Sequence, residues 1–244
     1  MFDIVIPLGP HDTELHNLHI TLNSRNIVGY RNIYVITEWS GNLHQSCIKV
    51  CDSVFPFSLS SVADIHGPSS RNGWYLQQLF KLYAGLVVPG ILPRYLVVDA
   101  DTFFLRPVTF ESSDKKPLYN FALKRDVHLP YFQHMATVDA RLKRANNRMS
   151  GVCHHMMFDT AIVKEMFGNA KPFWRVFLES VHPDQYLYSG ASEYEIYFNF
   201  VLLFHKDDIV LRSLKSKDVS VLDTSLNCDY ISYHSYLRSK QSEV

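Results

Sequence analysis

The sequence predicts a single α/β domain with a mostly parallel central sheet flanked by helices. Its 244 residues, 47% of them hydrophobic, are enough for one large domain with a sizeable core. Short apolar runs alternate with amphipathic segments through the first half of the chain, which is typical of a parallel sheet covered on both faces. The chain shows no internal repeat and no linker. We therefore expect one domain over residues 1–237 and a polar tail over residues 238–244.

The first half supplies the strands and helices that define this class. Predicted strands are short apolar or β-branched runs, at Phe2–Leu8, Asn32–Thr37, Ser53–Phe57 and Tyr95–Asp99. Predicted helices have apolar residues at helical spacing, at His11–Asn26 (Leu15, Leu18 and Leu22), Asn42–Val50 and Gly73–Leu86. His16 and His19 are one helical turn apart, and we expect them on a solvated helix face. Trp74 and Tyr75 are expected in the core or in the wall of a cleft.

The second half has a more mixed pattern. Strands are predicted at Tyr119–Leu123 and His155–Phe158, and helices at Tyr131–Asn147, Thr160–Gly168, Pro172–Val181 and Glu193–Phe204. Asp208–Leu214 and Asp229–Tyr233 complete the predicted elements.

Composition excludes some classes of protein. The 24 Lys and Arg residues equal the 24 Asp and Glu residues, and a nucleic-acid-binding protein normally has a basic excess. No apolar run reaches the roughly 18 residues of a membrane-spanning helix. The first residues form a strand pattern without a basic leader, so no signal peptide is visible. The four cysteines are interpreted as reduced and structural, which favours a cytoplasmic protein.

Two carboxylates follow the most apolar strand of the sequence. Tyr95-Leu96-Val97-Val98 leads directly into Asp99-Ala100-Asp101. Side chains alternate along a strand, so Asp99 and Asp101 point the same way if the strand persists that far. Like charges this close need a cation between them, and carboxylate oxygens suit Mg²⁺ or Mn²⁺. The chain has no glycine-rich phosphate loop after the first strand, so a metal on this pair would hold phosphate instead.

Three segments together resemble a known group of enzymes. The segments are Gly73-Trp74-Tyr75-Leu76-Gln77-Gln78-Leu79-Phe80-Lys81-Leu82, then Tyr95 through Thr102, and later Ser192-Glu193-Tyr194-Glu195-Ile196-Tyr197. They are similar to the donor-site segments of GT-A glycosyltransferases. The closest likeness is to small bacterial and large-DNA-virus families that include the algal-virus capsid glycosyltransferases, and it spans roughly Phe2 to Tyr236. The resemblance implies a Rossmann-like GT-A fold, an Asp-x-Asp metal site for Mn²⁺ or Mg²⁺, and a nucleoside-diphosphate sugar, with UDP as the nucleotide. The acceptor would be a hydroxyl of a glycan or glycoprotein.

The resemblance also assigns roles to residues at the donor site. Asp101 would chelate the metal, Asp99 would contact the metal or the ribose, and His234 would be a third metal ligand, with His205 as its rival. Lys81 would reach the diphosphate or pair with the aspartates. The other donor contacts would come from the loop after the first strand, from the residue between the aspartates and from the His-His pair, namely Pro7, Leu8, Gly9, Asp12, Ala100 and His155.

Catalytic carboxylates are expected near the start of the predicted helix Glu193–Phe204. Ser192 is a good N-cap, and acids in a first helical turn are stabilised by the helix dipole, which by itself explains Glu193 and Glu195. The functional interpretation is that one of them, Glu193 before Glu195, faces the acceptor as a base or contacts the sugar. Asp99 joins them as a candidate catalytic residue. In the His154-His155 pair, successive strand residues face opposite ways, so only one histidine would face the cleft.

Two other functions fit parts of this pattern. A nucleotidyltransferase acting on sugar phosphates also uses acidic metal ligands, but the Pro7-Leu8-Gly9-Pro10 loop lacks the basic residues that hold a triphosphate. A non-catalytic nucleotide-sugar-binding module would bind the donor without turnover. The sequence leaves open the donor sugar, the acceptor, retention or inversion, the oligomeric state and whether the chain is one domain of a longer protein.

Overall fold

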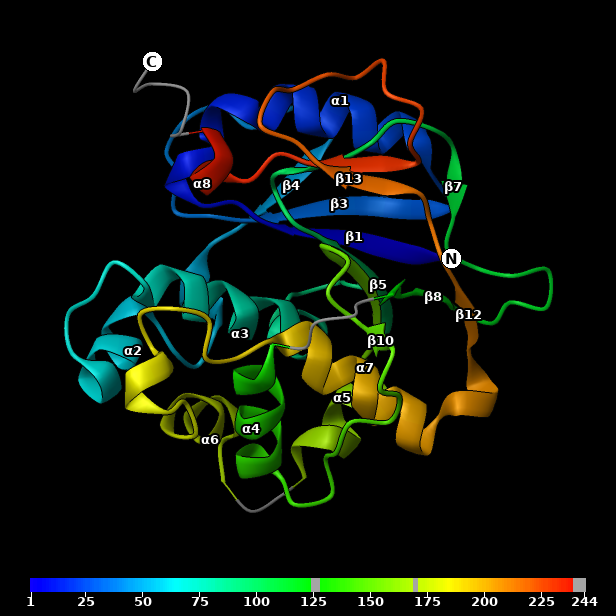
Figure 1. The fold of residues 1–244 in the computed structure, drawn as a ribbon. Helices are drawn as coiled ribbons and strands as arrows, with labels where there is room; N and C mark the ends of the chain where they lie inside the picture. The colour runs from blue at the N-terminus through cyan, green and yellow to red at the C-terminus, as the bar shows by residue number, and fades with distance from the viewer. Residues whose placement is uncertain (124–127, 169–170, 239–244) are drawn as a thin grey trace.

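A five-stranded sheet forms the centre of the molecule. The computed structural model describes residues 1–123, 128–168 and 171–238. The central sheet of this described chain has the order β11–β5–β1–β3–β4 (Figure 1), formed by β1 (Phe2–Pro7), β3 (Tyr30–Ile36), β4 (Cys47–Val50), β5 (Arg94–Val98) and β11 (His155–Asp159). β5, β1, β3 and β4 run parallel, and β11 is antiparallel to β5 at one edge. The predicted α/β class with a mostly parallel sheet is therefore confirmed.

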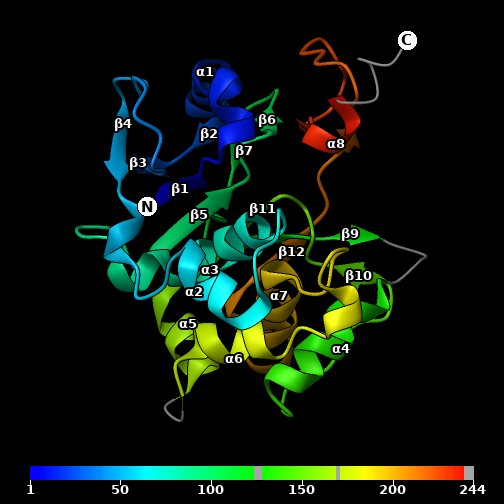
Figure 2. The same ribbon diagram turned by 90° about the vertical axis from the view of Figure 1, so that its left-hand side faces the viewer.

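Helices lie on both sides of this sheet. In Figure 1, α1 (His16–Asn26) lies above the sheet and α3 (Asn72–Val87) lies below it, where it packs against β1, β5 and β11. The view turned by 90° in Figure 2 shows the same separation. The other helices are α2 (Leu59–His66), α4 (Leu129–Val138), α5 (Thr160–Phe167), α6 (Phe173–Glu179), α7 (Glu193–Phe204) and α8 (Ser235–Arg238). Among the helices of the described chain, none has the length and apolar character needed to cross a bilayer.

Short strands and turns complete the fold. The minor strands are β2 (Ile27–Val28), β6 (Thr102–Phe104), β7 (Val108–Thr109), β8 (Leu118–Asn120), β9 (Ala122–Leu123), β10 (Met149–Ser150), β12 (Val210–Arg212), β13 (Ser216–Asp218) and β14 (Tyr230–Ser232). The 3₁₀ turns are η1 (Pro10–Leu15), η2 (Asp52–Val54), η3 (Pro183–Gln185) and η4 (Lys206–Asp208). β14 pairs with β6, so a segment from the end of the described chain lies beside the residues that follow β5.

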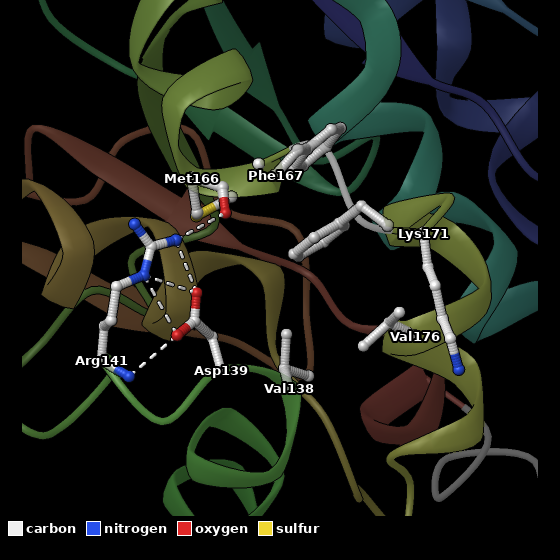
Figure 3. Close-up of a pocket in the computed structure, with 9 residues that line it drawn as sticks. Val138, Asp139, Arg141, Met166, Phe167, Lys171 and Val176 are labelled. Carbon is white, nitrogen blue, oxygen red and sulfur yellow. Dashed lines mark hydrogen bonds and ion pairs between the residues drawn. The ribbon is translucent and has the colours of Figure 1, made fainter.

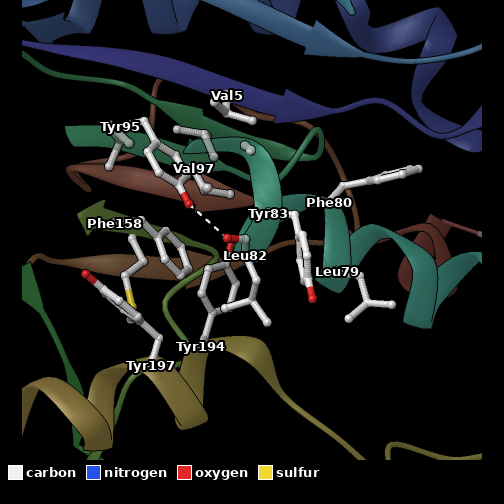
Figure 4. Close-up of a cluster of buried hydrophobic side chains, with 14 of the residues drawn as sticks. Val5, Leu79, Phe80, Leu82, Tyr83, Tyr95, Val97, Phe158, Tyr194 and Tyr197 are labelled. Atoms are coloured by element: carbon white, nitrogen blue, oxygen red, sulfur yellow. Dashed lines mark hydrogen bonds between the residues drawn. The ribbon is translucent and has the colours of Figure 1, made fainter. Parts of the chain in front are cut away.

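The main core lies between the central sheet and the helices below it. Figure 4 shows aromatic rings from β5, β11 and α7 packed against α3, with Tyr95 and Phe158 stacked at 5.5 Å between ring centroids. The Tyr95 hydroxyl donates to the Lys81 carbonyl at 3.1 Å and to the Leu82 carbonyl at 3.2 Å. A buried tyrosine needs a partner for its hydroxyl, and these bonds satisfy it while holding α3 against β5. This contact positions Lys81 beside the end of β5.

Some predicted elements are wrong, for local reasons. Residues 42–50, predicted as a helix, contain the edge strand β4, because Cys47–Val50 forms a parallel pair with the edge of β3 that faces away from β1. Residues 53–57, predicted as a strand, begin in the 3₁₀ turn η2 and then pack Phe55 and Phe57 against Phe80. The helix predicted to reach Asn147 ends at Val138. Phenylalanine clusters and isolated β-branched residues give similar patterns in a turn and in a strand.

Helix α1 buries a polar face that was predicted from the sequence to be solvent-exposed. Leu18 is 39% exposed, whereas His16 and His19 are buried. His19 Nε2 lies 3.0 Å from the Asp99 carbonyl, and the Asn23 amide donates to the Thr102 carbonyl at 3.0 Å. Because these side chains satisfy backbone groups of the turn after β5, their burial is compensated. The expectation of a solvated His16–His19 face is therefore wrong.

Candidate active site at the carboxyl edge of the sheet

The turn after β5 is held by backbone bonds from two distant segments. The strand ends at Val98, and the Asp99 amide donates to the His154 carbonyl at 2.9 Å. The Tyr233 amide donates to the Asp101 carbonyl at 2.8 Å. The condition of the prediction, that the strand continues through the two carboxylates, is not met, because both lie beyond the strand. Strand alternation therefore does not orient them. The turn geometry and its neighbours set their directions instead.

Asp99 is surrounded by groups that stabilise its charge. Lys81 Nζ lies 2.6 Å from Oδ1, the Tyr194 hydroxyl donates to the same oxygen at 2.8 Å, and His154 Nδ1 lies 3.2 Å from Oδ2. Burial disfavours the ionised carboxylate, but Lys81 and His154 outweigh it and hold the pKa of Asp99 well below its usual range. Both oxygens already have partners, so the structure favours Asp99 as an organising residue.

Lys81 is buried between two carboxylates. Its side chain is 2% exposed, and Nζ contacts Asp99 at 2.6 Å and Glu193 at 2.7 Å. Burial alone would lower the pKa of Lys81, but the two carboxylates raise it. Of the two predicted contacts for Lys81, the structure shows the pairing with an aspartate, and only with Asp99 among the described residues.

The two glutamates of α7 have different surroundings. Glu193 is 3% exposed and contacts Lys81, and burial followed by the repulsion of Asp99 raises its pKa despite that cation. Glu195 instead accepts from the Ser150 hydroxyl at 2.5 Å and from the Asn199 amide at 3.2 Å. One lysine cannot neutralise two carboxylates fully, so Glu193 keeps the greater affinity for a proton. Glu195 lies outside the Lys81 contacts and ties α7 to β10.

Asp101 contacts His234, which lies beside a second histidine and a second aspartate. His234 Nδ1 lies 2.8 Å from Asp101 Oδ2, and His234 Nε2 lies 3.7 Å from Asp218 Oδ1. Burial lowers the pKa of His234, but Asp101 and Asp218 outweigh this effect and raise it to about 10. The rings of His154 and His234 lie 4.5 Å apart between centroids. These contacts form an acid–histidine cluster of Asp101, His154, Asp218 and His234.

Three residues of this cluster bring ligand atoms close enough together to hold one cation. Asp101 Oδ1 is buried and has no hydrogen-bond partner. His154, Asp218 and His234 each offer a ligand atom, all within 4.8 Å of one another. Carboxylate oxygens and imidazole nitrogens together suit Mn²⁺, and a bound cation would replace the proton that His234 otherwise holds. His154 also has φ of 61°, a left-handed backbone that is strained for a histidine and common at functional sites.

The loop after β1 lies at the same edge of the sheet. Pro7 ends β1, Leu8 is buried with its amide donating to the Ile36 carbonyl at 2.9 Å, and Gly9 is half-buried. Burial is the main cause that raises the pKa of Asp12, and the charge of Asp101 adds to it, so Asp12 lies within electrostatic reach of Asp101.

Arg238 forms an ion pair with Asp12 at this edge of the sheet, with Nη2 2.5 Å from Oδ1. The sequence assigned Arg238 to the polar tail, but it ends helix α8; residues 239–244 lie outside the described chain.

His155, the histidine predicted to contact the donor, is buried in the core. His155 is 1% exposed and packs against Phe104, Phe110 and Tyr230, with Nε2 on the Asn120 amide. Burial lowers its pKa to about 3. As the first residue of β11, it points into the core, while the residue before it turns toward Asp99.

Other residues of the site had weaker sequence signals. His154 was visible only as one of two adjacent histidines, and Tyr194 only as a spacer between glutamates. Asp218 had no signal, since it depends on the pairing of β13 with β14. His205, the alternative metal ligand, follows the C-terminal end of α7, where its Nε2 lies 3.0 Å from Glu165 Oε2.

A separate cavity lies between α4, α5 and α6. It has a volume of about 370 Å³. Figure 3 shows the Asp139–Arg141 ion pair and the apolar side chains that line it. No residue of the acid–histidine cluster contributes to its lining. The predicted site and this cavity are therefore different places.

The fold and the cluster define a class of protein with a mostly parallel α/β sheet and a charged site beyond the carboxyl ends of its strands, where such folds bind ligands. A family model described as a family of unknown function (DUF6492) matches residues 20–233, and the chain belongs to this family. A comparison with curated proteins finds no similar sequence.

Proposed function

We propose that this protein is a metal-dependent glycosyltransferase of the GT-A fold. It would transfer a sugar from a nucleoside-diphosphate sugar, with UDP as the nucleotide, to a hydroxyl of a glycan or glycoprotein. The main support is one juxtaposition: the ion-paired Asp99–Lys81–Glu193 group and the acid–histidine cluster flank the same turn at the carboxyl edge of the sheet. The free cysteines are consistent with the proposed reducing cytoplasm.

In this proposal the two sides of the turn have separate tasks. Asp101 and His234, with His154 or Asp218, would hold Mn²⁺ or Mg²⁺, which when bound would neutralise charge on the diphosphate. Asp99 would stay ionised and fix the turn through Lys81 and Tyr194. The buried ion pair keeps these side chains in one arrangement before any ligand arrives, which lowers the cost of ordering them on binding.

Glu193 would be the carboxylate that accepts the acceptor's proton. Its proton affinity is raised by burial, as an efficient base near neutral pH requires. Lys81 moderates that affinity, because its positive charge favours the ionised form. Glu195 would contribute only by holding α7 in place.

A screen of nucleotide sugars tests the proposal. We expect Mn²⁺-dependent hydrolysis of one UDP-sugar, abolished by EDTA and by Asp101→Asn. Asp114→Asn, which changes an exposed aspartate elsewhere, is the matched control and should leave the rate unchanged. Release of pyrophosphate from a nucleoside triphosphate and a sugar phosphate would instead identify a nucleotidyltransferase. Binding of UDP without turnover of any donor would identify a binding module.

A further inference from the structure

One stripe of helix α3 leads from the ion-paired carboxylates to a second positively charged residue. Lys81, Gln78 and Trp74 lie in α3, and Arg71 is the N-cap residue just before it, with helical backbone angles. The four are spaced by three, four and three residues, so they lie along one face. The Glu193 amide donates to Gln78 Oε1 at 3.0 Å. Arg71 therefore lies on the same face as Lys81, about 15 Å further along the helix axis.

Arg71 is partly buried without a negative partner. Among residues 1–123, 128–168 and 171–238, no carboxylate forms an ion pair with it. Its guanidinium lies 4.2 Å from the ring centroid of Trp74, and Nη2 donates to the Tyr188 carbonyl. Nε is buried and has no hydrogen-bond partner. Taking a guanidinium out of water is unfavourable unless a counter-charge compensates it.

Tyr131 connects Arg71 to the proposed active site. It extends from α4 toward the loop that contains Ser189. Burial is the main cause that raises the pKa of Tyr131; Glu193 raises it further and Arg71 lowers it. Tyr131 is therefore within electrostatic reach of both groups.

We propose that Arg71, held by Trp74 and flanked by Tyr131, forms a subsite for an anionic group on the acceptor, so that the acceptor is an acidic saccharide. This rests on the proposed function, because it assigns the acceptor to the residues around Arg71, beyond Glu193. A guanidinium binds a carboxylate or a phosphate with paired, charge-assisted hydrogen bonds. The stacked ring of Trp74 fixes the guanidinium plane before the ligand arrives, as a positioning residue.

Two matched pairs of probes test this subsite without any donor. Binding to the full chain is measured by calorimetry at physiological salt for cellobiouronic acid against cellobiose, and for glucose 6-phosphate against glucose. Each pair differs only in the anionic group. We expect at least about tenfold tighter binding of an acidic probe, the size expected for hydrogen bonds to charged groups. The pair that shows the preference tells whether the group is a carboxylate or a phosphate.

Arg71 variants decide whether this residue is responsible. Arg71→Gln should abolish the preference for the acidic probe and leave neutral binding unchanged, while Arg71→Lys should keep part of it. Arg175→Gln, at an exposed ion pair on α6, is the matched control. Near-ultraviolet circular dichroism establishes that each variant is folded. Equal binding of acidic and neutral probes to the wild type, or an undiminished preference in folded Arg71→Gln, would overturn the proposal.

The donor screen separates the two proposals. Acidic binding that depends on Arg71 without hydrolysis of any nucleotide sugar would retain the anion subsite and reject the transferase. Hydrolysis without acidic preference would retain the transferase and reject the subsite.

Discussion

Lys81 is buried and contacts two carboxylates, those of Asp99 and Glu193, so its replacement by methionine should be strongly destabilising. Methionine keeps most of the buried apolar volume, and the change therefore removes charge more than packing. Deleting one partner of a buried ion pair costs about 3–5 kcal/mol. With Nζ at 2.6 Å from Asp99 and 2.7 Å from Glu193, and a side chain 2% exposed, we expect a loss within this range at pH 8.

Urea unfolding at two pH values measures this loss. In Lys81→Met, the folded-state pKa of Glu193 rises further above its unfolded value, because the cation that opposed burial is gone. The folded variant then binds a proton more readily than the unfolded chain, so stability is greater at low pH and is lost as the pH rises. The penalty should therefore be smaller at pH 5 than at pH 8.

A second substitution identifies the charge as the cause. Lys81→Met with Glu193→Gln should recover about half of the loss, because the amide removes one unpaired buried charge. Lys164→Met, at an exposed lysine of α5, is the control and should change stability by less than about 0.5 kcal/mol. A Lys81→Met protein within about 1 kcal/mol of the wild type at pH 8, or no recovery in the double variant, would refute the reasoning.

Two further predictions concern stability. Burial lowers the pKa of His134 to about 4, so the unfolded chain binds this proton more readily and stability falls as the pH drops from about 6.5 toward 4. Between pH 7 and pH 5 the free energy of unfolding, measured by urea titration, should fall by about 2 kcal/mol because of this histidine. The fall should be smaller in His134→Gln, and equal pH dependence of the variant and the wild type would contradict the prediction. Gly85→Ala would place a Cβ 2.5 Å from the Tyr95 ring and should cost about 1–3 kcal/mol in thermal unfolding. Gly73→Ala, where a Cβ meets open space, is its control, and equal effects would show that α3 can shift.

Long periodic elements were predictable because their local pattern agrees with their burial. The helix predicted at Gly73–Leu86 matches α3 within a residue at each end, and Glu193–Phe204 matches α7. The short edge strand at Cys47–Val50 was not predictable, because its conformation depends on pairing with β3. The buried polar face of α1 was also missed, since His19 and Asn23 are satisfied only by backbone groups from a distant turn.

The candidate site shows the same division. Asp99, Asp101 and Lys81 come together because a buried strand and the helix before it deliver them to one edge of the sheet. The sequence-based prediction chose His155 over His154. Strand alternation indicates only that the two side chains point to opposite faces of the sheet, and not which of them faces the site. The choice depends on where β11 begins and on the left-handed backbone of His154, which no local pattern specifies.

The segment after β14 has a consequence for how the protein assembles during synthesis. The central sheet is complete once β11 has formed, at Asp159. His234 meets Asp101 across 133 positions of sequence, and Arg238 meets Asp12 across 226. Contacts so distant form late, because the intervening chain must be ordered first. On the ribosome, the α/β core can therefore fold well before the acid–histidine cluster exists, and the cluster becomes complete only when residue 234 has emerged.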